Sequence, residues 1–503
     1  MLARGSEGNG TEVPSFFFYP HGGPISLRPL HNPWQKGKKM IVYDEHTRTL
    51  LRDEHLFDLQ EPEEPEHFDD VFPEGQVPRI VFNHRHVPMW PAAQTWITDT
   101  TFRDGQQAMP PFTPEQIVHI YDLLHKLGGE KGLIRTSEFF LYRERDREAV
   151  ERCLELDHRY PEVTAWIRAH PKDFELVKDM GLDETGILTS VSDYHIFHKW
   201  PGANRRKAID RYLGVVKECL SAGIRCRCHF EDITRADFYG FVIPFAIELR
   251  KLAEQAGMPI RIRMCDTMGY AVPYPGAALP RSVPGIVYGL RQHAGFPGEW
   301  LEWHGHNDFH KALVNGVTAW LYGASAVNAT CLGIGERTGN TPIEALVIEH
   351  LALRGHDETV NTPAITEIAR YFEDEVGYDI PDQQPFVGSR FNTTLAGIHA
   401  DALAKDRRIY TVFDTETVLG APFDIRITDK SGRAGVAHWV NLHLELSGED
   451  EVSKDHPGVS AMFDAVAQQY DEGRVAIMSP EELLELVIEH IPELADRARE
   501  AQE

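Results

Sequence analysis

Two short segments in different parts of the chain contain the residue types that hold a divalent metal ion. In one, His304 and His306 follow an apolar run typical of a strand, where alternate side chains share a face, so both imidazoles point the same way. In the other, Asp104 follows a second short strand and adds a carboxylate. Two imidazoles and one carboxylate bind a divalent ion and leave positions open for substrate. Arg103 can stabilise an oxygen that becomes negative, so we predict metal-assisted chemistry on a carbonyl compound.

The elements that must position these groups follow a regular alternation of short apolar runs and amphipathic stretches. We expect strands at 95–99, 133–140, 163–168, 186–192, 225–232, 260–266, 301–307 and 326–333. We expect helices near 114–127, 145–157, 171–180, 204–222, 237–256, 276–294, 309–322 and 342–353. This pattern predicts an α/β fold, a TIM (β/α)8 barrel, whose active site lies where the strands end. The polar residues of interest lie at those ends.

The regions outside the barrel have a different texture. We divide the chain into an N-terminal arm at 1–90, the barrel at 91–355, a linker with helical and hairpin subdomains at 356–440, and a C-terminal helical region at 441–503. The arm is irregular, with many Gly and Pro residues. Residues 423–439 suggest a small hairpin, and Ser479 is a good N-cap for a helix in the last region.

The composition argues against several classes of protein. The net charge of −26 argues against nucleic-acid binding, which requires a basic surface, and disfavours binding to anionic membranes. No apolar run has the length of a membrane span, and the N-terminus lacks the features of a signal peptide. The six cysteines show neither a disulfide framework nor a CxxC spacing. We therefore expect a soluble cytoplasmic protein with reduced thiols.

Five motifs resemble the signature of the Claisen-condensing branch of the DRE-TIM metallolyases. In chain order they are TDTTFRDGQQ at 98–107, FED at 230–232, DTMG at 266–269, HGHND at 304–308 and GIGERTGN at 333–340. This branch includes 2-isopropylmalate, homocitrate and citramalate synthases and the Re-type citrate synthase. The resemblance covers residues 95–445 and implies an acyltransferase that condenses acetyl-CoA with a 2-oxo acid.

The resemblance implies a role for each motif residue. The metal ligands would be Asp104, His304, His306 and Asn340, and the ion would be Mn²⁺, Co²⁺, Mg²⁺ or Zn²⁺. Arg103 would hold the ketone or the developing alkoxide.

Further residues would bind the substrates. Glu231 matches the carboxylate of the fifth strand, and Glu138, Arg168, His195 and Thr267 would contact the 2-oxo acid. In the loop after the last strand, the glycines 333, 335 and 339 can present backbone N–H groups to a phosphate or thioester.

Two residues beyond the barrel complete the resemblance. The segment 397–401 resembles a helical subdomain whose His, here His399, reaches the barrel of a partner subunit with a nearby Tyr, here Tyr410. The resemblance therefore implies a homodimer with shared sites.

The acceptor is the least constrained part of this hypothesis. The stretches 137–142, 187–198 and 231–235 favour the Re-citrate synthase subgroup, which uses oxaloacetate and releases citrate and CoA. The strands also carry Arg135, Arg227, His229 and Arg263, cations suited to an acceptor with a second acidic group. His229 is the best placed of these, whereas Arg135 and Arg263 could instead face the helices. 2-Isopropylmalate, homocitrate, 2-phosphinomethylmalate and 2-phosphonomethylmalate synthases are the alternatives.

Other classes fit less well. A biotin-dependent carboxyltransferase would need a metal-binding Lys on a strand, and a 3-hydroxy-3-methylglutaryl-CoA lyase would need a Cys in the loop that here contains 333–340. A degenerate binding protein would have lost some ligands, and all four are present. A second His-x-His at 84–86 has no carboxylate motif nearby, so we predict a role on the surface or in the arm.

Overall fold

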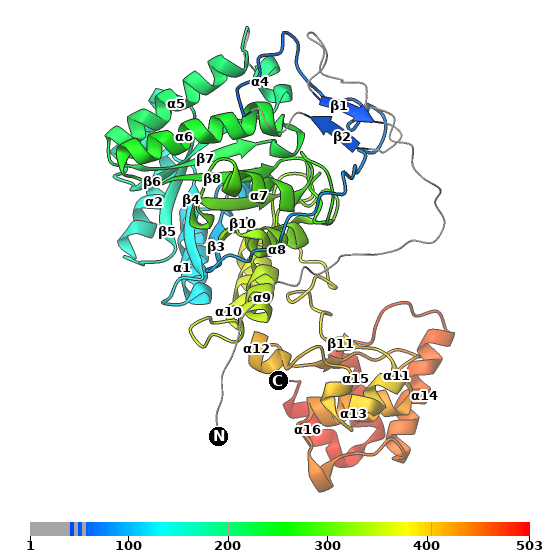
Figure 1. Cartoon of the computed structure of the whole chain (residues 1–503). Coiled ribbons are helices and arrows are strands. Elements are labelled where there is room, and N and C mark those ends of the chain that lie inside the picture. Colours follow the sequence, from blue (N-terminus) through cyan, green and yellow to red (C-terminus); the bar gives the residue numbers. More distant parts are fainter. Residues whose placement is uncertain (1–40, 45–48, 53–56, 200–201, 404, 503) are drawn as a thin grey trace, which may run out of the picture.

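A closed barrel of eight parallel strands forms the centre of the molecule, as the sequence predicts (Figure 1). The computed structural model describes residues 41–44, 49–52, 57–199, 202–403 and 405–502. The barrel strands are β3 (Trp96–Asp99), β4 (Ile134–Phe139), β5 (Glu162–Arg168), β6 (Glu184–Ser190), β7 (Arg225–Glu231), β8 (Ile260–Asp266), β9 (Leu301–Gly305) and β10 (Ala326–Ala329). They follow the chain order around the barrel, and β10 pairs with β3 to close it. Each expected strand is found, although the last one ends earlier than predicted.

Helices on the outer face cover the barrel. They are α1 (Pro114–Gly128), α2 (Glu144–Glu155), α3 (Pro171–Asp179), α5 (Arg205–Ser221), α6 (Ile243–Ala256), α7 (Val283–Gln292), α8 (Ala312–Tyr322) and α9 (Ile343–Arg354). All eight correspond to expected helices. The start of α7 differs from its predicted place near 276, because Ser282 is its N-cap and the residues before it form a loop. A short helix, α4 (Asp193–Lys199), was not expected.

Alternation along each strand separates the core from the barrel lumen. On β7, Cys226, Cys228 and Phe230 belong to the hydrophobic core, whereas Arg227 and His229 point the opposite way, into the lumen. The sequence also left open which way the side chains of Arg135 and Arg263 point. Arg263 lies in the lumen and pairs with buried carboxylates, whereas the guanidinium of Arg135 lies 4.0 Å from the ring centre of Trp96, the first residue of β3.

The arm packs against the loop that precedes α7. Its first paired elements, β1 (Ile41–Asp44) and β2 (Thr49–Arg52), are antiparallel. Further along, Phe68, Val71, Phe72 and Val81 form a small core with Ala278. The backbone N–H of Ala278 donates to the carbonyl of Val81 at 2.8 Å, which ties arm and loop together.

Beyond the barrel, a C-terminal module (residues 393–502) has its own hydrophobic core (Figure 1). Its elements are β11 (Thr393–Thr394), α11 (Gly397–Leu403), β12 (Asp424–Ile425), α13 (Gly432–His443), α14 (Pro457–Asp471), α15 (Pro480–His490) and α16 (Ala495–Glu500). Helix α10 (Ala364–Tyr371) precedes the module and packs on α1. The short helix α12 (Thr415–Leu419) lies within the range of the module and contacts α10. In the described residues, no helix is both long enough and apolar enough to cross a lipid bilayer.

The hairpin predicted at 423–439 is wrong. β12 is only two residues long and pairs in parallel with β11, and most of the remaining segment forms α13. This segment forms a helix and not a hairpin because Val436, Trp439 and Val440 fill the module core from one helical face. The predicted N-cap is confirmed: the Ser479 hydroxyl accepts from the backbone N–H of Glu482, whose carboxylate accepts from the N–H of Ser479.

Candidate active site

The three residues that the sequence alone predicts as metal ligands meet at the C-terminal rim of the barrel. His304 lies on β9, His306 follows it, and Asp104 lies in the loop after β3. The Nε2 atoms of the two histidines are 3.3 Å apart, and Oδ2 of Asp104 lies 3.5 Å and 3.7 Å from them. Over the described parts of the chain, this is the one group of three or more His, Cys, Asp or Glu side chains whose ligand atoms all lie within 4.8 Å.

The electrostatics of this cluster suit metal binding. Burial lowers the pKa of His304 and of His306, so both imidazoles are neutral at pH 7. Burial alone would raise the pKa of Asp104, but the positive charge of the neighbouring Arg103 leads the interactions that lower it below its usual value. Neutral imidazoles and an ionised carboxylate are the forms that ligate a metal ion.

Unsatisfied atoms in the cluster give an independent test of the fit. Oδ2 of Asp104 and Oδ1 of Asn340 are buried and have no hydrogen-bond partner among the described residues. Such atoms are costly unless a ligand satisfies them. Nδ1 of His304 lies 2.7 Å from Oδ1 of Asn328 on β10. A proton donated there leaves the Nε2 lone pair turned toward the cluster, so the donor set fits a divalent cation.

The glycine loop after β10 places Asn340. The backbone N–H of Asn340 donates to the carbonyl of Gly333 at 2.9 Å, and its side-chain amide donates to the carbonyl of Ile334 at 3.1 Å. A Cβ at Gly335 would lie 2.0 Å from that amide nitrogen, so only glycine fits there. Gly339 likewise has a positive φ of 86°. The role of this loop in binding CoA stays a prediction.

Arg103 is held beside the cluster by two kinds of contact. Its Nη1 donates to Oδ1 of Asp104 at 2.9 Å. Its guanidinium lies 4.6 Å from the ring centre of Trp166, so an aromatic face supports the cation. This orientation leaves a fixed positive charge next to the place where a metal-bound carbonyl would lie.

The predicted cations of the acceptor pocket are mostly paired already. Arg263 donates to Glu138 at 2.7 Å and lies 2.9 Å from Glu302, and Arg227 lies 3.0 Å from Glu302. His229 lies 3.2 Å from Glu138, and burial lowers its pKa to about 4. The two arginines therefore neutralise buried carboxylates, and His229 is neutral at pH 7. His229 can offer a hydrogen bond to a diacid acceptor but not a full charge.

Glu231 lies at the end of β7, surrounded by donors. Its Oε2 accepts from Lys199 at 2.6 Å and from the hydroxyl of Ser190, and Nδ1 of His195 lies 3.3 Å from the same oxygen. The hydroxyl of Thr267 accepts from the backbone N–H of Asp232 at 2.8 Å. The structure thus brings together three predicted site residues: Glu231, His195 and Thr267.

Two predicted assignments receive less support. Arg168 is bonded by two nitrogens to Asp173, at 2.7 Å and 2.9 Å, and its side chain is 64% exposed. His399 and Tyr410 lie together, with ring centres 4.0 Å apart, but they belong to the C-terminal module and not to the barrel (Figure 1). Their contact with a barrel mouth stays a prediction.

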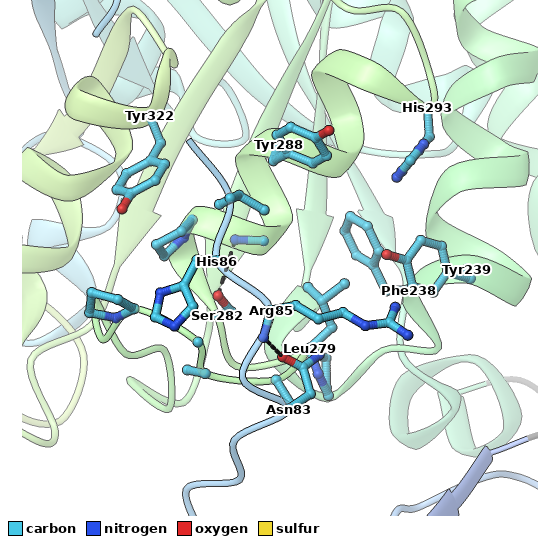
Figure 2. Close-up of a pocket in the computed structure, with 18 of the residues that line it drawn as sticks. Asn83, Arg85, His86, Phe238, Tyr239, Leu279, Ser282, Tyr288, His293 and Tyr322 are labelled. Carbon is cyan, nitrogen blue, oxygen red and sulfur yellow. Dashed lines mark hydrogen bonds between the residues drawn. The ribbon is translucent and has the colours of Figure 1, made fainter. Parts of the chain in front are cut away.

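A separate cavity of about 270 Å³ lies between the arm and α7, on the outside of the helix layer. Figure 2 shows His86 and Arg85 of the arm on one side, and Tyr288 and Tyr322 of the helices on another. Most of its lining residues are apolar or aromatic, and no Asp or Glu is among them. His86 of the second His-x-His lines this cavity, and neither His84 nor His86 belongs to a group of three or more metal-ligating side chains in the described part of the chain.

The comparisons with known proteins match this geometry. The HMGL-like family model matches residues 94–371, which is over half of the chain and includes the whole barrel. The chain belongs to the HMGL-like family. This match, together with the relatives below, confirms the predicted resemblance.

The chain is also similar to several curated synthases. It is 55% identical to a citrate (Re)-synthase of Syntrophus aciditrophicus, over 91% of this chain and 72% of that protein. It is 49% identical to a citrate (Re)-synthase of Clostridium kluyveri, over 88% and 98%. It is also 38% identical to a 2-phosphinomethylmalate synthase of Streptomyces hygroscopicus, over 84% and 96%.

Sequence reasoning missed three residues of this site. Asn328 is a polar residue in the middle of an apolar strand, a signal that was available. Trp166 on β5 gives no such signal. Both faces of a barrel strand are apolar, so the sequence does not show which face a tryptophan occupies. Lys199 lies on α4, a helix that the sequence pattern did not predict. Its contact with Glu231 could therefore not be predicted either.

Proposed function

We propose that this chain is a Re-citrate synthase that condenses acetyl-CoA with oxaloacetate and water to give citrate and CoA. The observation that carries the proposal is the identity of 55% and 49% to two citrate (Re)-synthases over most of the chain. The buried cluster of Asp104, His304 and His306 supports it, because it offers the ligands that such chemistry needs.

The residues divide the chemistry between them. Asp104, His304, His306 and Asn340 would hold a divalent ion, which when bound polarises the ketone of the 2-oxo acid. Glu231, ionised and partly buried, is the carboxylate that receives a proton from the acetyl methyl group. The carbon that loses this proton attacks the ketone carbon, and Arg103 balances the charge that develops on the ketone oxygen. Water then cleaves the thioester, which releases CoA.

The proton from the acetyl group needs a way out of the site. His399 and Tyr410 form a close pair with titratable groups, and their module lies apart from the barrel mouth of its own chain. We place this pair at the barrel mouth of a second subunit, so that the working unit is a homodimer.

Oxaloacetate is the proposed acceptor, with a phosphinate-bearing 2-oxo acid as the second candidate because of the 38% identity to the Streptomyces synthase. A branched aliphatic acceptor is less suited to a lumen that presents His229, Glu138 and Thr136. Manganese or cobalt would fit the mixed nitrogen and oxygen donors, and magnesium or zinc are the alternatives. The six cysteines are all free and buried, which supports a place in the reducing cytoplasm.

The experiment that tests this function combines metal removal with identification of the product. Purified protein is stripped by a chelator, reloaded with each of the four metals, and incubated with acetyl-CoA and oxaloacetate. We expect no turnover after stripping, and equal amounts of citrate and free CoA after reloading. Full turnover in chelator, or a condensation product other than citrate, would contradict the proposal.

A further inference from the structure

All three polar contacts of the Glu231 carboxylate are made by one of its two oxygens, Oε2. Three groups reach Oε2: the ammonium of Lys199 at 2.6 Å, the hydroxyl of Ser190, and Nδ1 of His195 at 3.3 Å. They come from two different elements, because Ser190 ends β6 while Lys199 and His195 lie on α4. A carboxylate fixed in this way has Oε1 available for a fourth partner.

The helix that carries Lys199 is itself firmly held. The carboxylate of Asp193, at the start of α4, accepts from two nitrogens of the buried Arg205 at 2.7 Å and 2.8 Å. The hydroxyl of Tyr194 donates to the carbonyl of His67 in the arm at 2.6 Å. These contacts fix the position of the helix that carries Lys199. The Lys199 side chain itself is 35% exposed.

The charges around Glu231 single out Lys199. The titratable groups that face it are His195 and Lys199 from α4, Tyr212 from α5, Cys265 from β8, and its own neighbour Asp232. Burial lowers the pKa of His195, and burial raises the pKa of Tyr212 and of Cys265, so all three are neutral at pH 7. Lys199 is thus the formal positive charge in contact with Glu231.

We propose that Lys199 is a positioning residue that holds Glu231 by Oε2 and keeps it ionised, so that Oε1 is the oxygen that accepts the proton. The inference deepens the proposed function, because it concerns the same proton transfer. Burial raises the pKa of Glu231, and the charge and hydrogen bond of Lys199, with the hydrogen bond from Ser190, are among the interactions that lower it below its usual value. Without the ammonium, Glu231 would become protonated at a higher pH and would lose activity there.

The test compares Lys199→Met and Lys199→Arg with the wild type, using the metal-loaded enzyme. The measurement is kcat/KM for acetyl-CoA from pH 3.5 to 8. We expect the acidic limb of the Lys199→Met profile to move upward by about one pH unit, because a nearby opposite charge shifts a carboxyl pKa by that amount or more. Lys199→Arg, which keeps the charge, should stay near the wild-type profile.

A matched control removes an ammonium that pairs with a carboxylate elsewhere. Lys178 pairs with Glu175 at 2.7 Å on the exposed face of α3, so Lys178→Met should leave the profile unchanged. If Lys199→Met does not fold, as judged by its thermal transition, Lys199→Gln takes its place in the same measurement.

An unshifted acidic limb in an active Lys199→Met enzyme would overturn the inference while the proposed function stands. If the KM for oxaloacetate also rises more than tenfold, Lys199 is a ligand of the acceptor instead. Failure of the proposed function is distinguishable, because the wild-type enzyme would then form no citrate at any pH.

Discussion

The barrel mouth and the C-terminal module contribute to the candidate site in different ways. At the mouth, the three ligand side chains are buried within 3.7 Å of one another, and supporting contacts come from the same domain. In the module, His399 and Tyr410 stack closely, but Tyr410 is 45% exposed and the module has a core of its own. The difference is that one chain supplies all of the proposed metal ligands, whereas the proposed acid–base pair lies in a module with a core of its own.

The largest effect should come from the metal site. His304→Ala removes one of two imidazole ligands, so we expect loss of bound metal and a fall in kcat of at least about 10³-fold. Metal content by elemental analysis and CoA release measure both parts. His84→Ala, in the arm, should change neither, and a variant of His304 that retains metal and rate would contradict the assignment.

Mixing two inactive variants tests whether the module of one subunit serves the barrel of the other. Glu231→Ala and His399→Ala should each lose about 10²-fold or more in rate, because each removes a proton-transfer group. In a random mixture of the two, half of the dimers are mixed and each has one intact site, so about a quarter of the wild-type activity should return. Mixed dimers verified by mass spectrometry that show no recovery would argue that each site uses its own module.

A smaller effect is expected from Asn328, the barrel residue that orients the imidazole of His304. Asn328→Ala removes the oxygen that lies 2.7 Å from Nδ1 of His304, so the imidazole loses its fixed orientation. We expect metal affinity to fall about 10–100-fold, the range found for such supporting partners. Excess metal should restore most of the rate. Unchanged affinity in a competition titration with a chelator would remove Asn328 from the site.

The acceptor pocket should respond selectively. His229→Ser removes a hydrogen-bonding side chain that lies 3.2 Å from Glu138, while the metal ligands stay in place. We expect the KM for oxaloacetate to rise about tenfold, as for loss of one hydrogen bond to a charged group. The KM for acetyl-CoA should change little. Equal changes in both constants would indicate a general distortion of the barrel.

The smallest effect concerns the module alone. Ser479→Ala removes the hydroxyl of a capping box at the start of α15, so the module should lose about 1 kcal/mol of unfolding free energy. Because the module has a separate core, thermal unfolding should show this change in the transition of the module while metal binding at the barrel is unaffected. A single transition that shifts as a whole would show that the two regions unfold together.

The sequence was most informative where side-chain spacing alone determines position. His304 and His306 share a strand face, so their meeting follows from alternation, and Asp104 joins them because the ends of barrel strands share one rim. Lys199 could not be predicted in this way, because its contact with Glu231 depends on the unexpected helix α4. The supporting role of Asn328 needed the register of β10 beside β9.

The error at residues 423–439 has a physical cause of another kind. The alternation from Phe423 to Ile427 suggested a strand, and Gly432 and Gly435 weakened the signal of the helix that follows. Packing of Val436 and Trp439 in the module core overrides that weak propensity. Local patterns therefore predicted the barrel and the helices of the C-terminal region, including the Ser479 cap, but failed at 423–439, where the fold follows no repeated unit.

The choice of acceptor is the central claim, and one comparison tests it most directly. The metal-loaded enzyme is assayed for CoA release with acetyl-CoA and, in parallel, oxaloacetate, 2-oxoisovalerate, 2-oxoglutarate, pyruvate and a phosphinate-bearing 2-oxo acid. We expect kcat/KM for oxaloacetate to exceed that for every other acceptor by at least about 100-fold, because only a matched site satisfies the buried polar groups of the lumen. A higher kcat/KM for 2-oxoisovalerate than for oxaloacetate would contradict the citrate assignment and make the protein an isopropylmalate synthase.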